Sequence, residues 1–147
     1  MSETSEVEVP PVDATTLPWW EATREHRLIL QACHDCASLQ HYPRALCIAC
    51  GGTDLGWTDA LGVGLVDSFS VVHRALPGFE APYVVARVRL AEGPILLTNL
   101  VDADVEAWVC DAAVSVRWRD LTDGRALPVF GPLAADLAST ARESAVI

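Results

Sequence analysis

The sequence predicts a mainly β fold with one helix near the N-terminus, a cysteine-rich segment after it, and a small antiparallel barrel in the second half. Three observations predict this order. Four of the five cysteines lie between residues 33 and 50. Beyond them come about five short strand-like runs separated by turn signals. No long helical pattern lies between these runs, which disfavours a parallel βαβ arrangement.

The helix is predicted over Leu17–Arg27. Thr16 can serve as its N-cap, and Pro18 is tolerated in a first helical turn. Trp19 and Trp20 are adjacent, so they are not expected to face one packing seam together. Either one tryptophan packs on the body while the other is half exposed, or the helix docks on a partner, since tryptophan is enriched at interface hot spots. Trp19 and Trp20 are therefore the candidate partner-binding residues.

The cysteines follow the pattern Cys33-x2-Cys36-x10-Cys47-x2-Cys50. Each C-x-x-C forms a tight turn that aims two sulfurs at one point, so two such turns supply the four thiolates of a closed tetrahedral zinc site. A closed shell leaves no open position for water or substrate, so the zinc is predicted to be structural. Four thiolates also suit iron, and an iron-type electron carrier stays open as an alternative.

The remaining chemistry-bearing side chains are predicted to have no catalytic role. His34 and His41 are expected at the surface, because four well-spaced cysteines need no histidine ligand. Cys110 stands alone and is expected to be a small buried apolar residue. The sequence contains no phosphate-binding glycine loop, no H-E-x-x-H and no G-x-S-x-G. No catalytic residue is therefore predicted.

The barrel strands are predicted from alternation. In the run 83–90 the apolar residues Val84, Ala86, Val88 and Leu90 share one face, and Arg87 and Arg89 share the other. The run 113–120 alternates in the same way, and Asp123-Gly124 is a hairpin turn signal. Five strands with a long central connection are compatible with an OB barrel, although the pattern alone fits a sandwich fragment nearly as well.

Charge and hydropathy disfavour several classes of partner. The net charge is −10 and all ten basic residues are arginine, so binding to phosphate backbones is disfavoured. A single-stranded nucleic-acid module remains a weak alternative, because OB barrels can bind single strands. No apolar run approaches the roughly 20 residues of a membrane-spanning helix. The acidic, proline-bearing first residues do not form a secretory signal, so a cytoplasmic protein is expected.

The order of these parts resembles a known family. The Trp-Trp helix leads into Cys33-x-x-Cys36, then into His41-Tyr42-Pro43-Arg44 and Cys47-x-x-Cys50-Gly51. Gly62-Val63-Gly64 opens the next strand, and Ala81-Pro82-Tyr83-Val84-Val85-Ala86 follows. Over about 17–132 the chain resembles the acyl-CoA-associated family with a rubredoxin-like zinc ribbon and an OB fold, catalogued as domain of unknown function thirty-five. Val109-Cys110-Asp111-Ala112 departs from the family's glycine-containing turn, so a positive φ there is expected to be costly.

The resemblance implies a helper subunit. Such proteins form complexes with thiolase-like enzymes, including the lipid-transfer-protein type, or with hotdog-fold enoyl-CoA hydratases. These complexes act on acyl-CoA substrates, for example in degradation of sterol side chains. We therefore expect a noncatalytic accessory subunit with structural zinc on Cys33, Cys36, Cys47 and Cys50, and with its acyl-CoA contacts unassigned. The expected partition is a disordered acidic tail over 1–13, helix and zinc ribbon over 14–57, an OB barrel over 58–132 and a C-terminal tail over 133–147.

Overall fold

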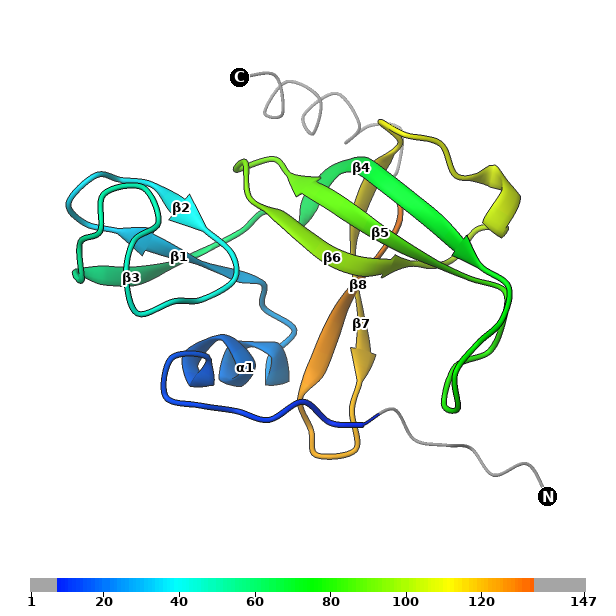
Figure 1. Cartoon of the computed structure of the whole chain (residues 1–147), viewed down its shortest axis with the longest axis horizontal. Coiled ribbons are helices and arrows are strands. Elements are labelled where there is room, and N and C mark those ends of the chain that lie inside the picture. The colour runs from blue at the N-terminus through cyan, green and yellow to red at the C-terminus, as the bar shows by residue number, and fades with distance from the viewer. Residues whose placement is uncertain (1–7, 134–147) are drawn as a thin grey trace.

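Two separate β-sheets and one helix make up the computed structural model, which describes residues 8–133 (Figure 1). Helix α1 (Leu17–Arg24) is followed by a three-stranded sheet in the order β2-β1-β3, from β1 (Ile29–Cys33), β2 (Leu39–Gln40) and β3 (Leu55–Asp59). Most of the predicted C-terminal tail, 134–147, and the first seven residues of the predicted acidic tail lie outside the described residues.

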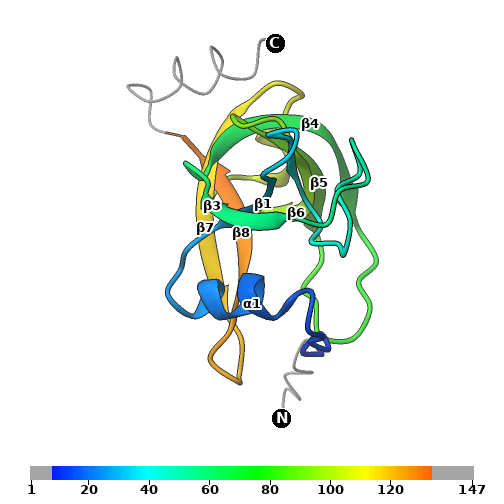
Figure 2. The ribbon, with the colours of Figure 1, turned by 90° about the vertical axis from the view of Figure 1, so that its left-hand side faces the viewer.

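The second sheet closes into a five-stranded barrel in the order β4-β5-β6-β8-β7. Its strands are β4 (Val63–Val72), β5 (Tyr83–Leu90), β6 (Ile95–Leu100), β7 (Ala113–Asp120) and β8 (Ala126–Pro132), with a short 3-10 turn η1 (Val105–Ala107) before β7. Neighbouring strands pair antiparallel except β6 and β8, which pair parallel at Leu100 and Phe130. Figure 2 shows these strands curving around a closed ring. The predicted mainly β fold is confirmed. Because the second sheet is closed, it is a barrel and not a sandwich fragment.

The alternation predicted for the barrel is the alternation observed. Val84, Ala86, Val88 and Leu90 are buried, while Arg87 and Arg89 face solvent. Apolar side chains from all five strands meet in the barrel interior, and each fully buried one is stabilising by about 1.5–3 kcal/mol relative to exposure. The completely or almost completely buried members of this core are Val66, Val84, Val88, Leu90, Val114 and Phe130.

Two positions in the barrel depend on a close backbone approach or on a left-handed backbone conformation. A Cβ at Gly64 would collide with the backbone carbonyl of Arg89 on the paired strand, so the Gly-x-Gly segment permits a close strand approach. Asp111 has φ 67°, so the turn that departs from the family pattern does adopt the left-handed conformation. Aspartate tolerates this conformation better than most residues, because its short polar side chain bonds locally.

Helix α1 begins as predicted but ends at Arg24 rather than Arg27. Glu25 is its C-cap, and His26 with φ 53° turns the chain away from the helical path. The expectation that one tryptophan would be half exposed is wrong: Trp19 and Trp20 are each only 8% exposed. Their rings pack edge to face at 4.8 Å. Both can be buried because α1 contacts the ribbon strand β1 and the barrel strand β8.

Arg125 contacts the segment that precedes this helix. Its side chain is buried over the ring of Trp20, 4.6 Å from the ring centroid. It pairs with Asp123 and donates to the carbonyl of Pro10 at 2.8 Å.

No helix among the described residues is long and apolar enough to cross a membrane.

Candidate functional site

The four clustered cysteines lie in two similar turns of the ribbon. Cys33 ends β1, and the N–H of Ala37 donates back to its carbonyl at 2.9 Å. In the second turn the N–H of Gly51 donates to the carbonyl of Cys47 at 2.8 Å. Ala37 and Gly51 both have positive φ, 64° and 76°. Each pair of sulfurs is therefore presented by one tight turn, as the spacing predicted.

The sulfur atoms have the geometry that zinc requires. All four Sγ atoms lie within 4.8 Å of one another. Cys33 and Cys50 are 3.7 Å apart at Sγ, and Cys36 and Cys47 are 3.6 Å apart. A tetrahedral zinc with bonds of about 2.3 Å separates its sulfurs by roughly 3.8 Å. The cluster thus fits a four-thiolate zinc with little rearrangement.

Neighbouring groups shift the pKa values of two thiols in the cluster in opposite directions. Hydrogen bonding with Ser38, first through its side chain and then its backbone, lowers the pKa of Cys36 to about 6. The Gly52 N–H favours the thiolate of Cys50, but the neighbouring sulfurs, Cys33 foremost, outweigh it and raise the pKa of Cys50 to about 12. A metal that binds all four thiolates must therefore displace protons from the cluster.

Two buried glutamines, which the sequence analysis did not single out, hold the loop between the cysteine pairs. Gln31 accepts from Arg44 N at 2.9 Å and donates to the Arg44 carbonyl at 2.8 Å. Gln40 donates to Gln31 and to the Leu46 carbonyl, and accepts from Ile48 N at 2.9 Å. The sequence did contain a signal for these glutamines. The loop between the cysteine pairs has few large apolar groups, so its backbone needs polar partners in the interior.

The Gln40→Met protein should be less stable by about 1–3 kcal/mol, because the partly buried Ile48 N–H and Leu46 carbonyl lose their partner. Urea denaturation of the zinc-loaded protein measures this loss. Arg44→Ala is the matched control, since Gln31 contacts only the backbone of residue 44. Equal stability of Gln40→Met and the parent would contradict the role assigned to this network.

The Ala37→Gly protein should be more stable by about 0.5–1 kcal/mol, because alanine at φ 64° is strained and glycine is not. Ala32→Gly is the opposite control, since Ala32 lies in β1 and glycine weakens a strand interior. Thermal unfolding of the two zinc-loaded variants should therefore shift in opposite directions. A shift in the same direction would show that the turn at Ala37 is not strained.

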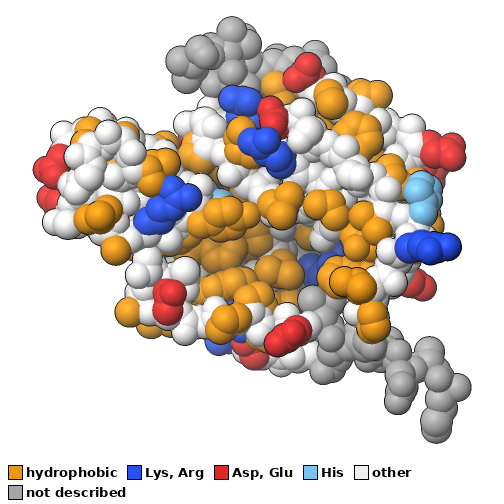
Figure 3. Space-filling model, in the orientation of Figure 1, with side chains coloured by type: hydrophobic (Ala, Val, Ile, Leu, Met, Phe, Trp, Pro, Cys, Tyr) orange, Lys and Arg blue, Asp and Glu red, His pale blue; other side chains and the backbone are white. Residues whose placement is uncertain are grey.

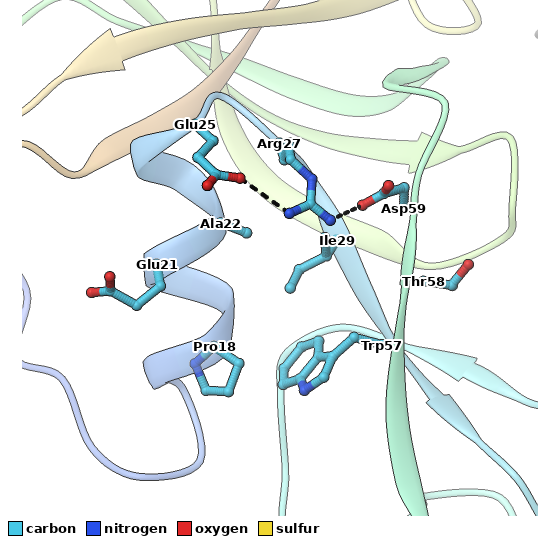
Figure 4. Close-up of a pocket in the computed structure, with 9 residues that line it drawn as sticks. All are labelled: Pro18, Glu21, Ala22, Glu25, Arg27, Ile29, Trp57, Thr58 and Asp59. Carbon is cyan, nitrogen blue, oxygen red and sulfur yellow. Dashed lines mark hydrogen bonds and ion pairs between the residues drawn. The ribbon is translucent and has the colours of Figure 1, made fainter.

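A hollow of about 370 Å³ lies between α1 and β3 (Figure 4). Its apolar surfaces include Ile29 and Trp57. Arg27 donates to Asp59 at 2.8 Å and to Glu25 at 3.2 Å across it, and these hydrogen bonds, the one to Asp59 foremost, raise the pKa of Arg27. All three charged side chains are at least half exposed, so these pairs add little stability. The hollow contains no nucleophile paired with a base.

Two expectations for single residues are wrong, and one is confirmed. His34 is exposed, 2.9 Å from Asp54, as expected. His41 is half-buried instead, with its ring next to Trp19 and Tyr42. Burial lowers its pKa to about 4, with a smaller contribution from Arg44. Cys110 is exposed rather than buried, because its neighbour Trp108 occupies the interior at this turn.

The fold and the cysteine site define a class of protein in which a zinc ribbon precedes an OB barrel. The family model described as the ChsH2 rubredoxin-like zinc ribbon domain matches residues 20–56. The model described as the ChsH2 C-terminal OB-fold domain matches residues 57–119. Because the matched domain is described as a zinc ribbon, the predicted zinc cofactor is confirmed.

This chain belongs to the DUF35 family. It matches a solved chain described as "Ltp2-ChsH2(DUF35) aldolase" with 38% identity and a TM-score of 0.79, covering 84% of this chain and 98% of that one. The family resemblance predicted from the sequence is confirmed.

Curated relatives have names of two kinds. The chain is 38% identical over 124 residues to a probable enoyl-CoA hydratase alpha subunit of Thermomonospora curvata, covering 84% of this chain and 39% of that protein. It is 31% identical over 116 residues to the 3-oxo-4,17-pregnadiene-20-carboxyl-CoA hydratase alpha subunit of Mycobacterium tuberculosis, covering 78% and 37%. It is 34% identical over 91 residues to a DUF35 domain-containing scaffold protein of Pyrococcus furiosus, covering 60% and 66%. The chain thus spans under two fifths of the hydratase-named relatives.

Proposed function

We propose that this chain is a noncatalytic partner subunit in an enzyme complex that acts on acyl-CoA substrates. Its catalytic partner is a thiolase-like enzyme of the lipid-transfer-protein type. One observation carries the proposal: almost the whole of a chain from an Ltp2-ChsH2(DUF35) aldolase is matched by this chain at 38% identity. The scaffold name of the archaeal relative supports a partner role.

The side chains of the described residues support a noncatalytic role for this chain, with catalysis carried out by the partner subunit. Between residues 8 and 133 no nucleophile lies against a base in a hollow, and most of the arginines pair with acidic side chains. The four cysteines Cys33, Cys36, Cys47 and Cys50 would hold a structural zinc whose shell is closed. Bond cleavage would then belong to the partner.

A hotdog-fold enoyl-CoA hydratase is the second candidate partner. The hydratase names of two relatives favour it, and the steroid acyl-CoA in one of those names makes sterol side-chain degradation the candidate pathway. The tryptophans assigned to partner binding would act indirectly. Trp19 and Trp20 are buried, so they would shape the surface of α1 rather than insert into the partner.

A tagged chain, expressed in its source cell and purified at moderate salt, tests this function. We expect a thiolase-like or hydratase-like enzyme to be retained in near-stoichiometric amount, as identified by mass spectrometry. The complex should cleave or hydrate acyl-CoA substrates, whereas the chain alone should not. Activity of the chain alone would overturn the noncatalytic role, and retention of nucleic acid or a reductase without any acyl-CoA enzyme would overturn the partner role.

The two other functions considered from the sequence have direct tests. An OB module for single strands should be retained on a single-stranded DNA column at moderate salt. We expect no retention, because Arg87 and Arg89 share Asp67, and Arg117 pairs with Asp102. An iron carrier should be red, whereas the zinc protein should be colourless with one zinc per chain.

A further inference from the structure

β3 lies at an edge of the ribbon sheet and has a strand partner on one side only. The sheet order is β2-β1-β3, and β1 pairs with β3 along the whole of Leu55–Asp59. Among the described residues no other strand pairs with β3, and no helix packs extensively against it. The opposite edge of the sheet, β2, has only two residues. β3 is therefore the longer free edge of this sheet.

Backbone groups of β3 that point away from β1 have no hydrogen-bond partner. The Ala60 N–H, directly after β3, donates to the Leu28 carbonyl at 2.8 Å. Because hydrogen-bonded pairs occur at every second residue of an antiparallel ladder, Thr58 also bonds to β1, whereas Trp57 and Asp59 point to the other side. The N–H and C=O groups of these two residues have no partner within residues 8–133. Such an unpaired edge is a template for one more strand.

β3 lacks the devices that often prevent pairing at a strand edge. Natural edges are commonly blunted by lysine, proline or a bulge. β3 contains neither residue, and its register with β1 is continuous. Its one charged side chain, Asp59, is already paired with Arg27. Thr58 and Asp59 are exposed, so this strand is accessible from solvent. The main chain of an extended peptide is the usual partner of such an edge.

The charge around β3 favours a basic segment. The hollow beside β3 is lined by the carboxylates of Glu21, Glu25 and Asp59 and by one guanidinium, that of Arg27. Figure 3 shows acidic side chains at the outer end of the ribbon and on α1 below it. The whole chain has a net charge of −10, so it would attract a basic segment and repel a second copy of itself.

A residue that pairs opposite Trp57 would lie beside this hollow, because directly opposed residues of a ladder share one face of the sheet. Trp57 extends into the hollow toward Pro18 of α1 (Figure 4), and together with Ile29 it provides apolar surface there. The aliphatic stem of a lysine or arginine can cover such a surface while its charged end reaches the carboxylates.

We propose that an extended segment of the partner enzyme pairs with β3 as a fourth strand of the ribbon sheet, and that a lysine or arginine of this segment lies opposite Trp57 and over the hollow. The partner enzyme of the proposed function supplies this segment, so the docking edge rests on that function.

Hydrogen exchange of the zinc-loaded chain, resolved to single residues, tests the pairing. In the free chain the amides of Trp57 and Asp59 should exchange fast and that of Thr58 slowly. In the purified complex with the retained enzyme, the Trp57 and Asp59 amides should slow by roughly tenfold or more, because each gains a hydrogen bond. Thr58 is the internal control, since it bonds to β1 in both states. The enzyme segment that becomes protected should contain a lysine or arginine, and its replacement by glutamine should weaken the complex.

Two substitutions of Trp57 separate the backbone donor from the side chain. Trp57→Pro removes the N–H that points away from β1 and keeps the bonds to β1, which is the position that proline tolerates on an edge strand. Trp57→Val keeps the N–H and a strand-forming side chain. The enzyme should bind Trp57→Pro at least about tenfold more weakly than Trp57→Val, because a carbonyl of the added strand is left unpaired. Stoichiometric zinc in both variants reports an intact ribbon. If Trp57→Pro loses its zinc, the amide exchange of the parent complex decides alone.

The outcomes separate this docking edge from the proposed function. Retention of the enzyme with the Trp57 and Asp59 amides still fast would overturn the docking edge and leave the function standing. Retention of no acyl-CoA enzyme would overturn both. Slow amides at these residues in a chain that dimerises by itself would assign the edge to a second copy and overturn the proposed occupant. A protected enzyme segment that is acidic or helical would overturn it equally.

Discussion

The Cys47→Ser protein should lose its zinc and the ordered structure of the ribbon while keeping its barrel. Three thiolates and one hydroxyl cannot complete the tetrahedral shell, and structural zinc supplies about 10–16 kcal/mol of folding energy in ribbon-sized peptides. Few apolar groups between the cysteine pairs remain to compensate. The barrel has its own closed sheet, which shares no strand pairing with the ribbon sheet, so its amides should stay protected.

Zinc content and hydrogen exchange measure the two halves of this prediction. Zinc should fall from one per chain to near zero, and the amides of β1 and β3 should exchange rapidly. Cys110→Ser is the control, because Cys110 is exposed and lies outside the cluster; its zinc content and exchange should match the parent. Retention of stoichiometric zinc and of slow exchange in Cys47→Ser would show that Cys47 is not a needed ligand. An intact partner complex with zinc-free Cys47→Ser would show that the metal is dispensable for assembly.

The Phe130→Ala protein should be less stable by about 3–5 kcal/mol. Phe130 is completely buried in β8, at the position where β8 pairs with both β7 and β6. Truncation removes apolar contacts and leaves a cavity that the closed barrel cannot readily collapse. A loss of this size is a large share of the roughly 5–15 kcal/mol that stabilises a typical domain.

Guanidinium denaturation of the zinc-loaded protein measures the effect, and Phe79→Ala is the matched control. Phe79 lies in the loop between β4 and β5, is 37% exposed and stacks on Tyr83. Its truncation should cost less than about 1 kcal/mol. Similar losses in the two variants would mean that the barrel interior repacks around the missing ring.

Features governed by neighbouring residues were predicted correctly. The two C-x-x-C turns are local, so their spacing indicated the cluster before any long-range contact was known. The faces of β5 followed from period-two alternation, which placed Val84 and Val88 inside and Arg87 and Arg89 outside. The hairpin at Asp123-Gly124 followed from its turn residues, and Gly124 has φ 90°.

Features that depend on contacts between distant segments were not predicted correctly. His41 is half-buried because Trp19 of α1 lies against it, and no local pattern predicts that contact. Cys110 is exposed because Trp108 takes the interior position. The glutamines Gln31 and Gln40 read as ordinary polar residues until β1 and β2 pair and bring their amides together over the loop.

By itself, then, the sequence determined the cysteine cluster and the strand faces, because each depends on spacing along a short stretch of chain, and it determined the family through the order of several such stretches. Only the tertiary structure decided that the five strands close into a barrel through the parallel contact of Leu100 with Phe130. It also decided that Trp19 and Trp20 are both buried, and that β3 lies at the edge of the ribbon sheet. These outcomes depend on which distant surfaces meet, and that choice is made by the sum of burial over the whole chain rather than by any local pattern.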